Sequence, residues 1–200
     1  RSGAPIALVL HPHPEHNGTM NNKVTYALYR TFVSAGFNTL RFNFRGVGKS
    51  EGKFDNGEGE LSDAASVLDW LQAYNPNASH CWIAGFSFGA WIGMQLLMRR
   101  PEVDGFIMAS PPANLFDFTF LAPCPVSGLF IQGDADTLVA PESVTQLAKT
   151  ISAQKNIQVQ DKRIVGADHF FVDRLDQLMK VSQDYLKASK AKGITLPRFS

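Results

Sequence analysis

Hydrophobic and polar positions form two kinds of pattern that follow one another along the chain: short apolar runs, and apolar residues spaced three or four positions apart. Short apolar runs rich in β-branched residues predict strands at about residues 6–11, 38–44, 80–86, 104–110, 126–132 and 157–165. Between these runs apolar residues recur every three or four positions, which predicts helices that begin near Val24, Leu61, Ala90, Pro141 and Leu175. Strands that alternate with helices predict a mostly parallel sheet of about six strands covered on both faces, an α/β/α sandwich of three layers.

The length and composition indicate one domain. The chain has 200 residues, of which 44% are hydrophobic, enough for a substantial core. No internal repeat or linker interrupts the pattern, so residues 1–200 are predicted to form a single domain. The tail from about residue 187 is basic and contains Gly193 and Pro197, and we expect it to be loose or on the surface.

Charge and targeting features narrow the classes of function. A formal net charge of +1 argues against a nucleic-acid partner, and no apolar run approaches the roughly 20 residues that span a bilayer. The first residues lack the combined features of a signal peptide, and Arg1 is not an initiator, as in a processed or trimmed chain. Two cysteines, Cys81 and Cys124, are too few for a disulfide framework, so a cytoplasmic location is predicted.

The stretch "RFNFRGVGKSEG" is similar to a phosphate-binding loop but fails its requirements. A GxxxxGK[ST] loop needs glycine at position 43, where this chain has Asn43. A dinucleotide-binding pattern needs a third glycine at position 51, where the chain has Glu51. The stretch is therefore interpreted as a glycine-rich turn after a strand, and nucleotide binding is set aside.

The most informative stretch is "CWIAGFSFGAWIGMQLLMRR". Gly85-Phe86-Ser87-Phe88-Gly89 fits GxSxG, with a predicted strand directly before it and a buried helix directly after it. This context is typical of a nucleophile elbow, a strained turn that exposes the serine hydroxyl above the sheet. Glycines at both ends are expected because neighbouring backbone must pass close to so sharp a turn.

A serine nucleophile needs a base and an acid that orients the base. "GLFIQGDADTLVAP" ends a predicted strand with two turn aspartates, Asp134 and Asp136, and "RIVGADHFF" places His169 on a loop after the last strand. Serine, aspartate and histidine thus occur in the order of the α/β-hydrolase triad, each at the carboxyl end of a strand. Asp168 is expected to be a turn or surface carboxylate.

The segments "HPHPEHNGTMNNK" and "RFNFRGVGKSEG", with the elbow and "GADHFF", resemble the α/β-hydrolase superfamily. Within it they resemble small bacterial hydrolases related to dienelactone hydrolase. The resemblance implies Asp136 as the triad acid, with Asp134 as the fallback. Asn17 replaces a glycine usual in that group, and asparagine tolerates the left-handed backbone expected there. Related proteins usually have strands before "PIALVL", so one sheet edge is expected to be shortened or missing.

Superfamily topology implies the strand order 2-1-3-4-5-6, which opens a crevice where the chain reverses direction. The loop "HPHPEH" then lies over Ser87, and the backbone N–H groups of Phe88 and His13 are the expected oxyanion donors. The alternative is a metal site formed by His11, His13 and His16, but the prolines are expected to hold the backbone extended, and only Glu15 could add a ligand. We expect no metal and no cofactor, with His11 and His16 in loop packing or at the pocket rim.

These residues favour a serine hydrolase that cleaves small acyl esters. "PPANLFDFTFLAPCP" is too short for a lid domain, which favours small substrates. Phe86, Trp91, Phe116 and Phe118 are expected to line the substrate pocket, with equal weight on the alternative that they cover the core edge. A thioesterase, a peptidase or a non-catalytic binding protein with this fold are the rival functions, and a homo-oligomer is left open.

Overall fold

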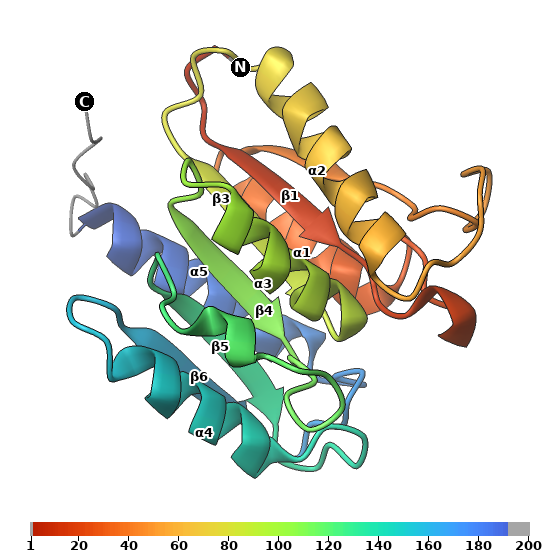
Figure 1. Cartoon of the computed structure of the whole chain (residues 1–200). Coiled ribbons are helices and arrows are strands. Elements are labelled where there is room, and N and C mark those ends of the chain that lie inside the picture. Colours follow the sequence, from red (N-terminus) through yellow and green to blue (C-terminus); the bar gives the residue numbers. More distant parts are fainter. Residues whose placement is uncertain (1, 192–200) are drawn as a thin grey trace.

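The computed structural model describes residues 2–191, and its centre is a six-stranded parallel sheet (Figure 1). The strand order is β2-β1-β3-β4-β5-β6, which confirms the predicted order. The strands are β1 (Ile6–Leu10), β2 (Asn38–Arg41), β3 (Cys81–Phe86), β4 (Gly105–Ala109), β5 (Gly128–Gly133) and β6 (Val159–Ile164).

Helices cover both faces of the sheet (Figure 1). Alternate residues of β1 enter different cores, with Leu8 on one face and Val9 on the other, as expected for a strand buried on both sides. On the face of Leu8 lie α2 (Glu58–Ala73), α3 (Phe88–Arg99) and α4 (Pro141–Ser152), and on the other face lie α1 (Lys23–Ser34) and α5 (Leu175–Ala191).

Strand β2 is shorter than its apolar pattern predicts. The prediction ran to residue 44, but pairing with β1 ends at Arg41. Beyond that point the side chain of Asn43 accepts a hydrogen bond from the N–H of Met20, and the N–H of Phe44 donates to His11 Nε2. The chain therefore leaves the sheet to bind the loop after β1. Within residues 2–191, β2 is the edge strand on this side.

Helix α5 includes the first residues of the tail that was expected to be loose or on the surface. The helix continues to Ala191 because its apolar face still packs on α1, with Leu186 buried. Lys190 Nζ also donates to the carbonyl of Ala35 and lies 5.6 Å from the centre of the Phe37 ring. The rest of the predicted tail lies outside the described residues.

The segment from residue 110 to 127, between β4 and β5, contains one short 3-10 turn at Thr119–Leu121. This leaves the carboxyl ends of the strands without a lid domain in the described part of the chain. Within residues 2–191, no helix is long and apolar enough to cross a lipid bilayer.

Candidate active site

Ser87 occupies a strained turn between β3 and α3. Its backbone angles are φ 53° and ψ −118°, a conformation that costs a non-glycine residue on the order of 1–3 kcal/mol. A Cβ atom at Gly85 would lie 2.5 Å from the carbonyl oxygen of Gly89, and one at Gly89 would lie 2.3 Å from that of Leu10. The prediction that close backbone requires both glycines is confirmed.

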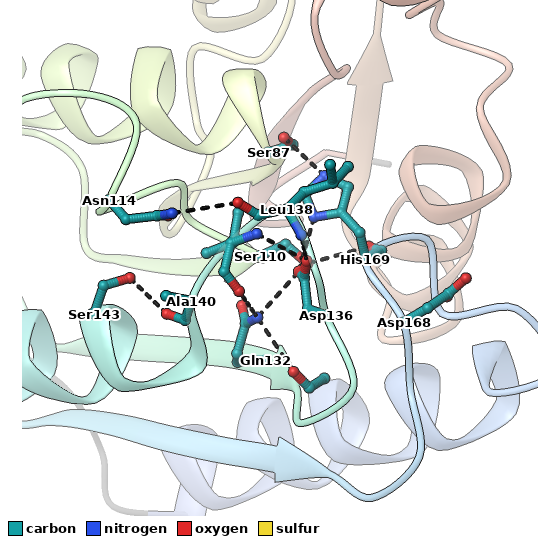
Figure 2. A network of polar contacts seen from close by, with 12 residues as sticks. Ser87, Ser110, Asn114, Gln132, Asp136, Leu138, Ala140, Ser143, Asp168 and His169 are labelled. Atoms are coloured by element: carbon teal, nitrogen blue, oxygen red, sulfur yellow. Dashed lines mark hydrogen bonds and ion pairs between the residues drawn. The ribbon is translucent and has the colours of Figure 1, made fainter.

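The three predicted triad residues are brought together by hydrogen bonds (Figure 2). His169 Nε2 lies 3.1 Å from Ser87 Oγ, and His169 Nδ1 lies 2.8 Å from Asp136 Oδ2. A carboxylate can only accept, so Nδ1 carries the proton and Nε2 is left to accept from the serine hydroxyl. His169 is therefore held in the tautomer that a general base needs.

Asp136 is a buried carboxylate with donors on both oxygens. Oδ1 accepts from the backbone N–H groups of Leu138 and Val139, both at 2.8 Å, and Oδ2 accepts from Gln132 Nε2 at 3.0 Å and from His169. Burial alone would raise the pKa of Asp136, but the hydrogen bonds and charge of His169 and the backbone donors outweigh it and lower the pKa. Asp136 is thus kept ionised beside His169.

Gln132 is a site residue that the sequence analysis missed. It is fully buried at the end of β5, and its amide NH2 faces three acceptors: Asp136 Oδ2 and the carbonyls of Gly133 and Val139. The side chain therefore ties the Asp136 turn to the strand. The available signal was a polar residue inside the apolar run "GLFIQG".

The other two aspartates support loops. Asp134 is exposed, and its Oδ1 accepts from the N–H of Gly166 at 2.6 Å, which joins the turn after β5 to the loop that carries His169. Asp168 Oδ1 accepts from the N–H of Val172 within its own loop. In the structure Asp136, and not Asp134, is the carboxylate that contacts His169.

Ser110, at the end of β4, was also missed. It is fully buried with φ 47°, and its hydroxyl donates to the backbone carbonyl of His169 at 3.2 Å (Figure 2). Residues other than glycine seldom adopt a positive φ. The backbone conformation of Ser110 is therefore imposed by the surrounding structure. The bond fixes the backbone of His169 from the sheet side.

Removing the Ser110 hydroxyl is expected to lower the catalytic activity of the folded protein, and this loss should be independent of any change in stability. Ser110→Ala and Ser110→Gly should each lower kcat/KM by about 3–10-fold, the value of one hydrogen bond. Glycine relieves the positive φ, so Ser110→Gly should be more stable than Ser110→Ala by about 1 kcal/mol. Kinetics with a chromogenic acyl substrate and urea unfolding of both variants check this. Unchanged kinetics in both would contradict a positioning role.

The loop "HPHPEH" lies against the elbow. The His13 ring centre is 5.0 Å from that of Phe88 and 4.3 Å from that of His16, and a 3-10 turn follows at Pro14–His16. Asn17 has φ 61°, which confirms the expected left-handed backbone. Phe88 is the first residue of α3, so its N–H lacks a partner within the helix.

His11 locks this loop to the segment after β2. Nε2 accepts from the N–H of Phe44 at 3.0 Å, and Nδ1 donates to the carbonyl of Pro12 at 2.7 Å. Burial lowers the pKa of His11 to about 4, partly offset by the bond to Pro12. Both ring nitrogens are engaged, and no group of three potential metal ligands occurs in the described part of the chain. This is the loop-packing role expected for His11.

Stability is expected to fall on mild acidification because of His11. The unfolded chain protonates this side chain near pH 6.5, whereas the native state does so only near pH 4. Unfolding therefore takes up a proton between these values, and the free energy of unfolding should fall by up to about 1.4 kcal/mol per pH unit. Urea unfolding between pH 7 and 4.5 tests this. His11→Gln should reduce the slope and His16→Gln should not; equal slopes in all three proteins would be the contrary result.

The predicted aromatic pocket is only partly exposed. Trp91 and Phe116 are half-buried and stacked, with ring centres 4.4 Å apart, and Phe116 lies 6.1 Å from Phe88. Phe86 is fully buried below the His169 ring, and Phe118 is buried in the core. These two residues are therefore core residues and do not form an open substrate wall.

A parallel sheet in the order β2-β1-β3-β4-β5-β6, with a strained serine bonded to a histidine–aspartate pair, defines an α/β hydrolase of the lidless serine type. The family model agrees with this class. The chain belongs to the X-Pro dipeptidyl-peptidase (S15) family, whose model matches residues 1–194.

Three bacterial proteins are similar to this chain over most of its length. The uncharacterized protein RP471 of Rickettsia prowazekii (strain Madrid E) is 54% identical over 187 residues, which cover 92% of this chain and 79% of the relative. The structure of ATU1826, an α/β hydrolase of unknown function from Agrobacterium tumefaciens, is 52% identical with a TM-score of 0.93, covering 100% of this chain and 91% of that chain. XC6422 from Xanthomonas campestris, a serine hydrolase without a lid, is 33% identical with a TM-score of 0.85, covering 100% and 86%.

Proposed function

We propose that the protein is a serine hydrolase that cleaves small acyl esters through an acyl-enzyme intermediate. The observation that carries this proposal is the hydrogen-bonded series of Ser87, His169 and Asp136 at the elbow. The "HPHP" loop adds the resemblance to dienelactone hydrolase-like enzymes. The proposal places the protein in a reducing compartment such as the bacterial cytoplasm, because Cys81 and Cys124 are buried free thiols.

In this mechanism His169 Nε2 takes the hydroxyl proton of Ser87 as Oγ attacks the ester carbonyl. Asp136 holds the Nδ1 proton and stabilises the imidazolium that forms. The backbone N–H groups of Phe88 and His13 donate to the oxyanion. His169 then gives its proton to the leaving alcohol, and it activates a water molecule that releases the acyl group from Ser87.

Two features support small esters as the substrate class. The described loops form no lid over Ser87, and the stacked Trp91 and Phe116 offer an apolar surface beside the elbow. A proline-specific dipeptidyl peptidase is the second candidate, because the family model carries that description. Both candidates use Ser87 as the nucleophile, so they are distinguished by the bond that is cleaved, an ester in the first case and an amide after proline in the second.

A substrate panel tests the proposal. Wild-type protein is assayed with p-nitrophenyl acetate, butyrate and decanoate, with an acetyl thioester, and with Ala-Pro-p-nitroanilide. We expect turnover of the two short esters, weaker turnover of decanoate and none of the anilide. Cleavage of the anilide would favour the peptidase, because an amide is much less reactive than an ester. A preference for the thioester would favour a thioesterase, and no turnover would favour a binding protein.

A further inference from the structure

Three loops at the carboxyl edge of the sheet each expose a large apolar side chain next to the candidate site. Leu115 is 60% exposed, Leu138 is 51% exposed and Phe170 is 48% exposed. They belong to the segments after β4, β5 and β6, respectively. Isolated exposed apolar residues are common, but three on converging loops call for an explanation.

Two of these residues are tied to the site, Phe170 through its ring and Leu138 through its backbone. The Phe170 ring lies 5.0 Å from the His169 ring and perpendicular to it. The N–H of Leu138 donates to Asp136, and its carbonyl accepts from Asn114, which precedes Leu115 (Figure 2). Leu138 therefore lies beside Asp136, which orients the catalytic histidine, and Phe170 lies beside His169, which carries the proton.

The chemistry of acyl transfer gives this side of the site a definite occupant. When the tetrahedral intermediate collapses, the bond between the carbonyl carbon and the alcohol oxygen breaks, and that oxygen takes its proton from His169 Nε2. The leaving alcohol must therefore lie beside His169, while the oxyanion faces the donors at Phe88 and His13. The acyl group then occupies the remaining side of the site, next to Trp91 and Phe116.

We infer that Leu138 and Phe170 form an apolar subsite for the leaving alcohol, so that the preferred substrates are esters of alkyl or aryl alcohols rather than of charged or strongly polar ones. This inference rests on the proposed function and extends it from the acyl group to the alcohol. Apolar contact there excludes water from the alcohol side chain while His169 remains within reach of the ester oxygen.

The test compares ethyl, butyl and hexyl acetate, which share one acyl group and have alcohols of similar acidity. A fully buried methylene is worth about a fourfold gain in affinity, so a half-buried one should give about a twofold gain. Wild-type kcat/KM should therefore rise about 16-fold from the ethyl to the hexyl ester, by the same principle. Rates are followed by titration of the released acid.

Phe170→Ala and Leu138→Ala should each reduce the ratio of hexyl to ethyl kcat/KM by about threefold or more. Phe170→Leu should largely restore it. Trp70→Ala is the matched control, because Trp70 is 51% exposed near the far end of α2 and contacts Tyr74 instead of the site. Equal losses with the ethyl and hexyl esters would mean that these residues only support His169, and would overturn the subsite.

The outcomes separate this inference from the proposed function. Wild-type activity on acetate esters that does not depend on alcohol length refutes the apolar subsite and leaves the esterase intact. Absence of ester turnover and of a covalent fluorophosphonate adduct refutes the esterase itself, and the subsite with it.

Discussion

Ser87→Ala is expected to lower kcat for p-nitrophenyl butyrate by at least about 10⁴-fold, because removing the serine of such a triad leaves only the contributions of the oxyanion donors and binding. The free energy of unfolding should change by less than about 1 kcal/mol, since alanine adopts the same strained backbone and loses one partly exposed hydroxyl. Steady-state kinetics and urea unfolding measure the two quantities.

Ser143→Ala is the matched control for this variant. Ser143 is also a serine near a helix start, and its hydroxyl donates to the carbonyl of Ala140 outside the triad (Figure 2). Its activity should equal that of the wild type. If Ser87→Ala retained full activity on the ester, the nucleophile would have to be another group.

Asp136→Asn is expected to lower kcat by about 10⁴-fold, as a wrong histidine tautomer does in this type of site. The N–H groups of Leu138 and Val139 fix the position of an acceptor at Oδ1, so the asparagine amide oxygen must face them. Its NH2 group then faces His169 Nδ1. Because an amide NH2 can only donate, Nδ1 must be unprotonated and accept the hydrogen bond. The proton moves to Nε2, and His169 can no longer take the serine proton.

Asp134→Asn provides an isosteric control with the opposite expectation. Asp134 accepts one hydrogen bond from the N–H of Gly166, and an asparagine oxygen can accept the same bond. Its kcat should stay within about threefold of wild type. A large loss in Asp134→Asn with little loss in Asp136→Asn would reverse the assignment of the acid.

The strands and the elbow could be predicted because they depend on local patterns, whereas the strand order came from the resemblance to the superfamily. Apolar runs gave the strands, and GxSxG between a strand and a helix gave a turn where a Cβ atom added to either glycine would lie 2.3–2.5 Å from a backbone oxygen. The choice between Asp134 and Asp136 required the resemblance, because spacing alone does not tell which carboxylate a turn buries. The structure buries Asp136 against His169 and leaves Asp134 exposed.

Ser110 could not be predicted because its role depends on a contact between distant segments. It is bonded to the backbone of His169, 59 residues away in the sequence. Gln132 contacts residues no more than seven positions away, and its signal in the sequence was a polar side chain inside an apolar run. At Phe86 and Phe118 the structure favours core packing, the alternative that was given equal weight, because aromatic residues near a site serve the core as readily as the pocket and only burial distinguishes the two. The shortened β2 likewise reflects a distant partner, His11, which binds Phe44.

The most direct test of an activated Ser87 is the intact mass of the protein after incubation with a fluorophosphonate. We expect a single adduct on the wild type and none on Ser87→Ala, because only a serine deprotonated by a neighbouring base reacts readily with this reagent. No adduct on the wild type, or the same adduct on both proteins, would contradict a catalytic serine at the elbow.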